Sequence, residues 1–189
     1  MNSLDLFNKV IAAYTLQQVP REWTDFIDFL DKIQPKFIIE VGTFTGGSAY
    51  TFSHFAKTII AIDENDKFKK RSPILENCDL FFLNKSSKSG STVHHVEKIL
   101  KAHNTLADLL FIDGEHTYKG AKRDFKYYGK FVKPGGYIAL HDVLKSKQHI
   151  AQNCLVYKFW DQLKQEYPNH QEIIYGRKWG GIGIIQLPQ

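Results

Sequence analysis

The sequence predicts an α/β protein: a mostly parallel seven-stranded sheet with helices on both faces and a C-terminal antiparallel hairpin. Two observations lead to this class. Short apolar runs alternate along the chain with segments whose apolar residues recur at helical spacing, which is typical of strand–helix units. Only residues 176–180 separate the last two apolar runs, and because a parallel crossover needs more chain, these two strands must pair antiparallel.

The expected elements follow one another without a linker long enough to divide the chain. Two helices come first, near residues 4–14 and 23–33. Strands are expected at residues 36–41, 58–63, 79–83, 108–113, 137–142, 172–175 and 181–187. Helices between them are expected at residues 46–55, 93–100, 118–128 and 155–163. We therefore expect one domain over residues 1–189, with residues 1–34 packing on the sheet or covering the site.

Local residue choices support several of these elements. Pro20 lies just before the second helix, where its fixed φ and its missing N–H are tolerated. Residues 108–113 are almost continuously apolar, as expected for a strand that is covered on both faces. Residues 134–136, Pro-Gly-Gly, predict a turn into the strand that starts at Tyr137.

Composition restricts the class of protein further. The 189 residues are 43% hydrophobic and 24% charged, which is ordinary for a globular domain. No apolar run approaches the ~18 residues of a membrane span, and the N-terminus lacks the pattern of a signal peptide. Cys78 and Cys154 fit neither a C-x-x-C pair nor a disulfide framework. We therefore expect reduced cysteines and a cytoplasmic protein.

The net charge of +5 raises the chance of an anionic partner, but the positive charge is scattered. Lys69, Lys70 and Arg71 form the tightest run, and no aromatic-interleaved basic motif accompanies it. We expect a solvated basic surface rather than a nucleic-acid partner. The oligomeric state stays open, a homo-oligomer included.

The turn after the first expected strand, residues 40–48, is rich in glycine. Gly42 and Gly46 would let the backbone turn sharply and approach a ligand, beside the free N–H groups of a helix N-terminus. A dinucleotide fingerprint needs glycine where Phe44 stands, and a phosphate-binding P-loop needs lysine where Ser48 stands. A generic tight turn is the plain alternative. Asp63, 21 residues beyond Gly42, is placed to bind both hydroxyls of a ribose, which indicates a nucleoside ligand.

Two more acids follow neighbouring strands. Asp113 and Asp142 are expected at the carboxyl edge of the sheet, where open α/β sheets bind ligands. Converging carboxylates repel each other unless a cation neutralises them, and a divalent ion such as Mg²⁺ would do so. His141 stands beside Asp142, and imidazole suits Mn²⁺, Fe²⁺ or Zn²⁺ better than Mg²⁺.

The most specific pattern lies in residues 108–143, where F-I-D-G-x-H-x-Y is followed by P-G-G and H-D. Together with the E-x-G-x-x-x-G-x-S loop, it resembles the class I S-adenosylmethionine-dependent methyltransferases. Within that family it is similar to one branch of small methyltransferases. This branch is related to metal-dependent sugar O-methyltransferases, to the cephalosporin-hydroxylase-named proteins and, more distantly, to catechol O-methyltransferase. The resemblance runs from about Val19 to Val143 and resumes at residues 180–184. It implies a Rossmann-like fold and methylation that depends on S-adenosylmethionine.

The resemblance also implies roles for individual residues. Those expected to contact S-adenosylmethionine are Glu40, Gly42, Thr43, Gly46, Ser48, Asp63, Ser86 and Asp113. Glu40 would organise the loop and the ligand's amino group, and Ser86 would either contact the adenine or serve only as a turn residue. Asp113, His141 and Asp142 would hold Mg²⁺ or Mn²⁺. Because the relatives carry an acid in place of His141, a softer ion, a lining role for His141 and no metal at all stay open.

His116 stands three residues after Asp113, where the relatives carry their general base. The implied mechanism is that the ion lowers the pKa of an acceptor hydroxyl, His116 removes its proton, and the alkoxide attacks the sulfonium methyl group. The acceptor would be a small hydroxylated molecule, either a sugar or catechol-like. A helix-start residue bound to backbone is the alternative for His116. For the whole chain, the alternatives are a non-catalytic adenosine-binding or interaction protein and a nicotinamide dehydrogenase, which Phe44 disfavours.

Three further side chains have less specific expectations. Trp160 and Trp179 are expected to be packing residues, and Asp124 either supports the site from behind or lies on a helix surface.

Overall fold

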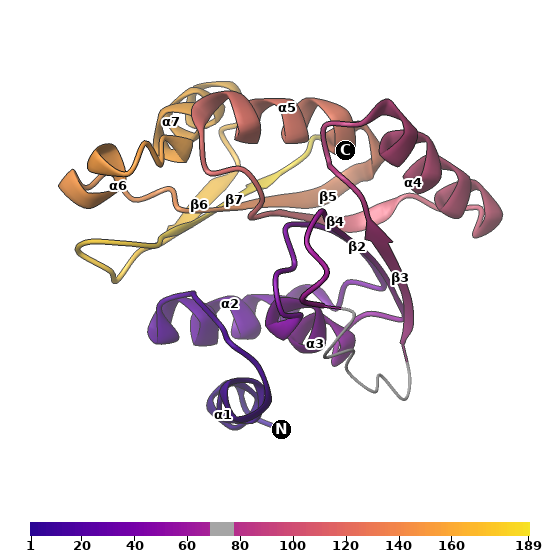
Figure 1. The fold of residues 1–189 in the computed structure, drawn as a ribbon, viewed down its shortest axis with the longest axis horizontal. Helices are drawn as coiled ribbons and strands as arrows, with labels where there is room; N and C mark the ends of the chain where they lie inside the picture. The colour runs from indigo at the N-terminus through magenta and orange to yellow at the C-terminus, as the bar shows by residue number, and fades with distance from the viewer. Residues whose placement is uncertain (69–77) are drawn as a thin grey trace.

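The computed structural model describes residues 1–68 and 78–189 and contains the predicted sheet (Figure 1). Its strand order is β3-β2-β1-β4-β5-β7-β6. The strands are β1 Phe37–Val41, β2 Thr58–Asp63, β3 Asp79–Asn84, β4 Ala107–Ile112, β5 Val132–His141, β6 His170–Ile173 and β7 Ile182–Gln186. The first five strands are parallel, and β7 pairs antiparallel with both β5 and β6. The predicted fold class is confirmed, whereas the basic run at residues 69–71 lies outside the described residues.

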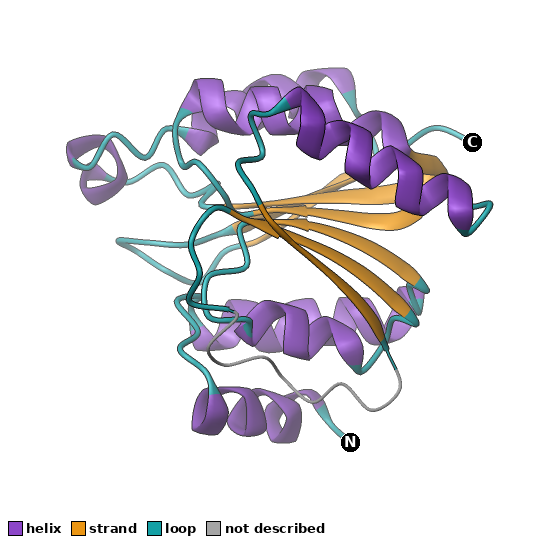
Figure 2. Ribbon diagram, turned by 45° about the vertical axis from the view of Figure 1, so that its right-hand side comes forward, coloured by secondary structure: helices purple, strands orange, loops and turns teal. Residues whose placement is uncertain are grey.

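Helices cover both faces of the sheet (Figure 2). One face carries α2, Pro20–Ile33, and α3, Gly47–Ser53, with α1, Ser3–Ala13, packed on these two helices (Figure 1). The other face carries α4 Gly90–Ala102, α5 Tyr118–Tyr128 and α7 Val156–Glu166. A short helix, α6 Lys147–Ala151, and a 3₁₀ turn, Gly129–Phe131, are also present in the described part of the chain. No helix within the described ranges is long and apolar enough to cross a bilayer.

The core follows from the period-2 alternation of strand side chains between the two faces of the sheet. All five residues of β1 are buried. Ile38 belongs to the same apolar cluster as Trp23 and Phe26 of α2, whereas Ile39 belongs to the cluster that contains Val96 of α4. A strand buried on both faces is therefore mostly apolar, and in β1 only Glu40 interrupts the apolar run.

One local expectation is wrong, and one short helix was missed. The Pro-Gly-Gly segment does not precede β5 but lies inside it: Ala107 pairs with Val132 and Leu109 with Tyr137, so the intervening residues form a bulge, with Gly135 at φ +71°. A sequence that is typical of a turn can therefore form a bulge within a longer strand. Helix α6 was not predicted, because its five residues are too few to show a helical period.

The loop between β6 and β7 is held against α2 by a buried carboxylate. Glu22 is wholly buried, and its Oε1 accepts hydrogen bonds from the backbone N–H groups of Tyr175 and Gly176, both at 2.8 Å. Its Oε2 accepts from the N–H of Gly181 at 2.7 Å. One side chain thus fixes a loop that lies more than 150 residues away in sequence.

We expect Glu22→Ala to lower the free energy of unfolding by about 3–5 kcal/mol, because it leaves three backbone N–H groups without their acceptor. Urea unfolding followed by circular dichroism measures this loss. Asp28→Ala, at an exposed position of the same helix, is the control and should change stability by less than about 0.5 kcal/mol. Equal stability of both variants and the unmodified chain would contradict the role given to Glu22.

Candidate active site

A cavity of about 720 Å³ opens at the carboxyl ends of the parallel strands. It lies at the point where the strand order reverses. The strands β2 and β3 lie on one side of β1, whereas β4 and the later strands lie on its other side. Its size lies within the range of about 300–1,000 Å³ that is usual for small-molecule sites. The predicted site residues that line it are Gly42, Thr43, Ser48, Asp63, Ser86, Asp113, His116, His141 and Asp142. Glu40 and Gly46 are not among its lining residues.

The glycine loop packs tightly against neighbouring backbone. Gly42 has φ +87°, and a Cβ there would lie 2.2 Å from the carbonyl oxygen of Asp113. Gly46 has φ +95° as the N-cap of α3, and a Cβ there would lie 2.3 Å from the ring of Phe68. Both positions therefore require glycine, one for the approach to β4 and the other for the entry into α3.

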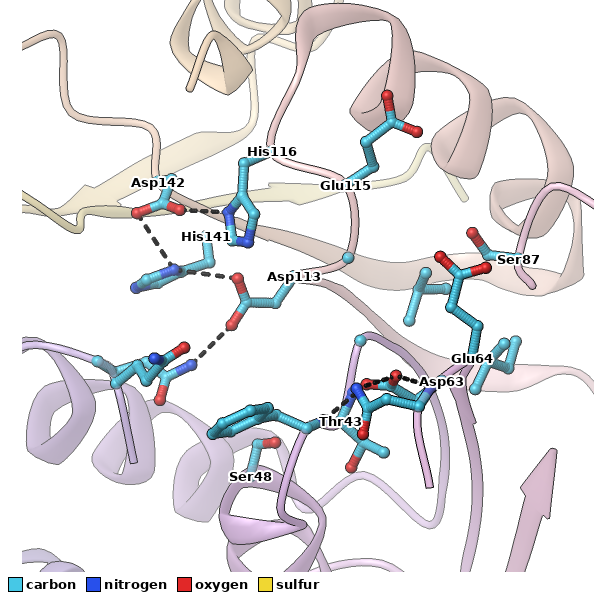
Figure 3. Close-up of a pocket in the computed structure, with 18 of the residues that line it drawn as sticks. Thr43, Ser48, Asp63, Glu64, Ser87, Asp113, Glu115, His116, His141 and Asp142 are labelled. Atoms are coloured by element: carbon cyan, nitrogen blue, oxygen red, sulfur yellow. Dashed lines mark hydrogen bonds and ion pairs between the residues drawn. The ribbon is translucent and has the colours of Figure 1, made fainter. Parts of the chain in front are cut away.

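Asp63 ties this loop to the end of β2 (Figure 3). Its Oδ2 accepts hydrogen bonds from the N–H groups of Thr43 at 3.0 Å and Phe44 at 2.8 Å, and its Oδ1 accepts from the N–H of Asn65. The sequence pointed to a ribose contact and gave no sign of this loop-holding role. Glu64, the next residue, is exposed and lines the same cavity, so it is a second acid within reach of a ligand there.

Glu40 lies beneath the loop, fully buried at the end of β1. Neither of its carboxylate oxygens has a hydrogen-bond partner of good geometry among the described residues. Burial raises the pKa of Glu40 to about 8, although the nearby hydroxyls of Ser48 and Thr43 counteract part of that rise. A cationic group of a ligand would stabilise the charged form of Glu40 and lower this pKa, so the site suits such a group.

The second half of the cavity holds a cluster of two acids and two histidines (Figure 3). His141 Nδ1 lies 3.1 Å from Asp113 Oδ1 and 3.4 Å from Asp142 Oδ1. His116 Nδ1 lies 2.6 Å from Asp142 Oδ2. Asp142 itself has φ +63°, a left-handed conformation that is uncommon for a residue other than glycine and is concentrated at functional sites.

Mutual attraction shifts the pKa values within this cluster. The hydrogen bond to Asp142 raises the pKa of His116 to about 10. Burial lowers the pKa of His141, but the charges of Asp113 and Asp142 outweigh burial and raise it well above its usual value. Burial raises the pKa of Asp142, but the two adjacent rings outweigh burial and lower it far below its usual range. Two imidazolium rings can therefore neutralise the two carboxylates. The sequence analysis had expected a divalent metal ion to do so.

The donor set nevertheless fits a divalent cation. Asp113, His141 and Asp142 each offer a ligand atom, and these three atoms lie within 4.8 Å of one another. Asp113 Oδ1 and both nitrogens of His141 are buried without a well-aligned hydrogen-bond partner among the residues that the structure describes. Two oxygens and one imidazole nitrogen favour Mn²⁺, Fe²⁺ or Zn²⁺ over Mg²⁺.

Several lining residues were missed by sequence reasoning. Gln18, in the linker between α1 and α2, donates from Nε2 to Asp113 Oδ2 at 2.7 Å. Trp179 packs its ring 5.1 Å from that of His149, and it also lines the cavity with 44% of its surface exposed, which the sequence did not indicate. Trp160, by contrast, is wholly buried as expected. Linkers and loops carry little periodic signal, and their contacts depend on tertiary placement.

Asp124 supports the site from behind and is not a surface acid. It is fully buried, and Ser87 donates a hydrogen bond from its hydroxyl to Asp124 Oδ1 at 3.0 Å. Ser86, which lines the cavity, accepts a hydrogen bond from Thr92 Oγ1 through its backbone carbonyl, as a turn residue would. Its proposed adenine contact stays a prediction.

Fold and cavity together define a Rossmann-like protein with a ligand site at the switch point of its sheet. A family model described as a methyltransferase domain matches residues 39–143, which is more than half of the chain. The chain belongs to this methyltransferase-domain family. Every site residue predicted from the sequence, from Glu40 to Asp142, lies within the matched segment.

One relative with a similar sequence is the uncharacterised protein R132 of Acanthamoeba polyphaga mimivirus. The two are 34% identical over 115 residues, which cover 55% of this chain and 50% of that protein. The chain thus spans about half the length of this curated relative.

Solved structures of methyltransferases share the fold. An O-methyltransferase from Bacillus cereus, in complex with SAH, is 17% identical with a TM-score of 0.62, over 97% of this chain and 90% of that chain. An rRNA methylase from Streptococcus thermophilus is 12% identical with a TM-score of 0.64, and the match covers 93% of this chain and 100% of that chain. The N-methyltransferase NodS from Bradyrhizobium japonicum, with S-adenosyl-L-homocysteine, is also 12% identical with a TM-score of 0.64, over 100% of both chains. These identities show the fold alone, and the three names cover three kinds of methyl acceptor.

Proposed function

We propose that the chain transfers a methyl group from S-adenosylmethionine to a hydroxyl group of a small molecule, such as a sugar or a catechol-like compound. The observation that carries this proposal is the shared cavity. The glycine loop lines one part of it, and the His116–Asp142 pair lines the other. A site for a nucleoside and a candidate proton acceptor therefore face the same space.

The first part of the cavity suits the donor. S-adenosylmethionine, when bound, supplies a methyl group on a positively charged sulfonium. Glu40, which lies beneath the glycine loop and not in the cavity lining, would offer its carboxyl group to the amino group of the methionine moiety. Asp63 or Glu64, which line the cavity, would offer a carboxylate to the ribose hydroxyls. The loop held by Asp63 keeps Gly42 close to the end of β4, so the backbone can approach a ligand without a side chain in between.

The second part suits proton removal from the acceptor. His116 is the candidate base, since its side chain is half-exposed and its Nδ1 is fixed by Asp142, which leaves Nε2 available to the cavity. Asp142 orients the ring and stabilises its protonated form, as a carboxylate does for a catalytic histidine. A divalent cation held by Asp113, His141 and Asp142 would supply positive charge that lowers the pKa of a nearby hydroxyl.

One observation favours a second candidate, a protein that binds S-adenosylmethionine without turnover. With its pKa raised to about 10, His116 is protonated at neutral pH and must lose that proton before it can act as a base. A cation on Asp142 would compete with the ring for the same carboxylate and so weaken the cause of the raised pKa. Turnover that requires a divalent cation therefore favours the enzyme, whereas tight binding without turnover under any ionic condition favours the binding protein.

The experiment is a methyl-transfer assay with a panel of small hydroxylated acceptors that includes sugars and catechols. S-adenosylhomocysteine release is measured after treatment with a chelator and again after addition of Mg²⁺ or Mn²⁺. We expect acceptor-dependent release that rises when the cation is restored. Release that never depends on an acceptor, with any cation, would contradict the proposed function.

A further inference from the structure

A second group of metal-ligating side chains shares Asp142 with the first. His116, Asp142 and Cys154 each offer a ligand atom, and these atoms lie within 4.8 Å of one another. They come from three elements: the turn after β4, the end of β5 and the loop between α6 and α7. The proposed methyl transfer uses His116 and Asp142 but leaves the thiol of Cys154 without a task.

Backbone hydrogen bonds hold the loop that carries Cys154 against the turn that carries His116. The N–H of Cys154 donates to the carbonyl of His149, and the N–H of Leu155 donates to the carbonyl of His116, each at 2.8 Å. Cys154 is 6% exposed, yet it lines the cavity. Its sulfur therefore faces a space that a small ion can reach, in a position fixed by two hydrogen bonds.

His149 adds a second observation at the same place. Its side chain is wholly buried, and its Nδ1 lies 2.6 Å from the carbonyl oxygen of Leu144, so Nδ1 must donate. Its Nε2 lies 3.2 Å from Asp142 Oδ1 and has no hydrogen bond of good geometry among the described residues. A third imidazole therefore lies against the carboxylate of Asp142, beside the ring of His116 and the thiol of Cys154.

The donor chemistry selects the ion. A thiolate, an imidazole and a carboxylate together suit a borderline-soft cation such as Zn²⁺, whereas Mg²⁺ prefers oxygen ligands alone. Bond lengths of about 2.0–2.3 Å place neighbouring ligand atoms about 3.3–3.8 Å apart around a tetrahedral ion. Because His116 Nδ1 now lies 2.6 Å from Asp142 Oδ2, these two atoms must separate by about 1 Å when an ion enters between them.

We propose that His116, Asp142 and Cys154 form a zinc site that is distinct from the Asp113–His141–Asp142 set. Zn²⁺ would replace the thiol proton and the proton shared by His116 and Asp142, and both protons would pass to solvent. Occupancy of this site would block the base and withdraw Asp142 from the other set. Zinc would therefore inhibit methyl transfer. This inhibition rests on the proposed function, whereas the existence of the zinc site does not depend on it.

Cobalt substitution tests the site without any catalytic assay. Co²⁺ added to the protein in the absence of S-adenosylmethionine should give a thiolate-to-metal charge-transfer band in the near ultraviolet, and Zn²⁺ should displace it. Cys154→Ser and His116→Ala should lose the band and bind zinc at least about tenfold more weakly. Asp113→Asn should keep the band, because Asp113 belongs only to the other set.

The matched control is Cys78→Ser, which removes the other free thiol, next to the start of β3 and outside the cavity lining. It should keep both the band and the zinc affinity of the unmodified chain. No band in the unmodified protein, or a band that survives Cys154→Ser, would overturn the proposal. The cobalt spectra need neither the methyl donor nor the acceptor. The zinc site can therefore be tested even if the methyl-transfer assay fails.

Discussion

Replacing His116 by alanine should lower the rate of methyl transfer by about 10²–10⁴-fold, the usual contribution of a general base. The affinity for S-adenosylmethionine should change little, since His116 lies in the part of the cavity opposite the glycine loop (Figure 3). Its side chain is half-exposed, so the variant should fold normally. Single-turnover kinetics with saturating donor and acceptor measure the loss in the chemical step alone.

The control for this variant is His95→Ala, at an exposed position of α4 that does not line the cavity. It should turn over at the rate of the unmodified protein. A rate for His116→Ala within about threefold of that rate would remove His116 from the mechanism, because a positioned base contributes far more.

Glu40→Gln should have opposite effects on stability and on donor binding. The folded state holds the proton of Glu40 up to a pKa of about 8, whereas the unfolded chain loses it near 4.5. The unmodified protein should therefore lose stability as the pH rises through this window, because the folded state binds more protons there. Glutamine removes that dependence, so the variant should be more stable at pH 9, by about 5 kcal/mol at most, and equally stable at pH 4.

The same substitution should weaken the binding of S-adenosylmethionine by about 10–100-fold, since a neutral amide replaces the carboxylate that would meet the ligand's amino group. Urea unfolding at several pH values and calorimetric titration at pH 8 measure the two effects. Glu166→Gln makes the same chemical change at an exposed position of α7 and should alter neither quantity. A Glu40→Gln variant that is less stable at pH 9, or that binds the donor unchanged, would contradict the role of Glu40.

The sheet could be predicted because its strands are buried on both faces. An apolar run such as residues 59–62 predicts a strand that is covered on both faces, and the short segment before β7 forces antiparallel pairing. Errors arose where local signals compete with tertiary structure. The glycines at 135 and 136 indicate a turn, yet β5 extends through them because pairing of Val132 with Ala107 holds the strand.

The site was predictable to the extent that it depends on strand ends. Asp63, Asp113 and Asp142 meet in one cavity because parallel strands carry their carboxyl ends to the same edge. Gln18 and Cys154 reach the same cavity from connecting segments, whose paths depend on packing and leave no periodic trace in the sequence. The pKa shifts within the histidine–aspartate cluster likewise depend on distances of a few ångströms, which sequence spacing does not specify.

We expect the glycine loop and the acids at the strand ends to accept an adenosyl ligand. Isothermal titration calorimetry of the protein with S-adenosylhomocysteine measures this binding without any knowledge of the acceptor. We expect saturable one-to-one binding that Asp63→Asn weakens, since that acid holds the loop amides of Thr43 and Phe44. No heat of binding at millimolar ligand would contradict this expectation.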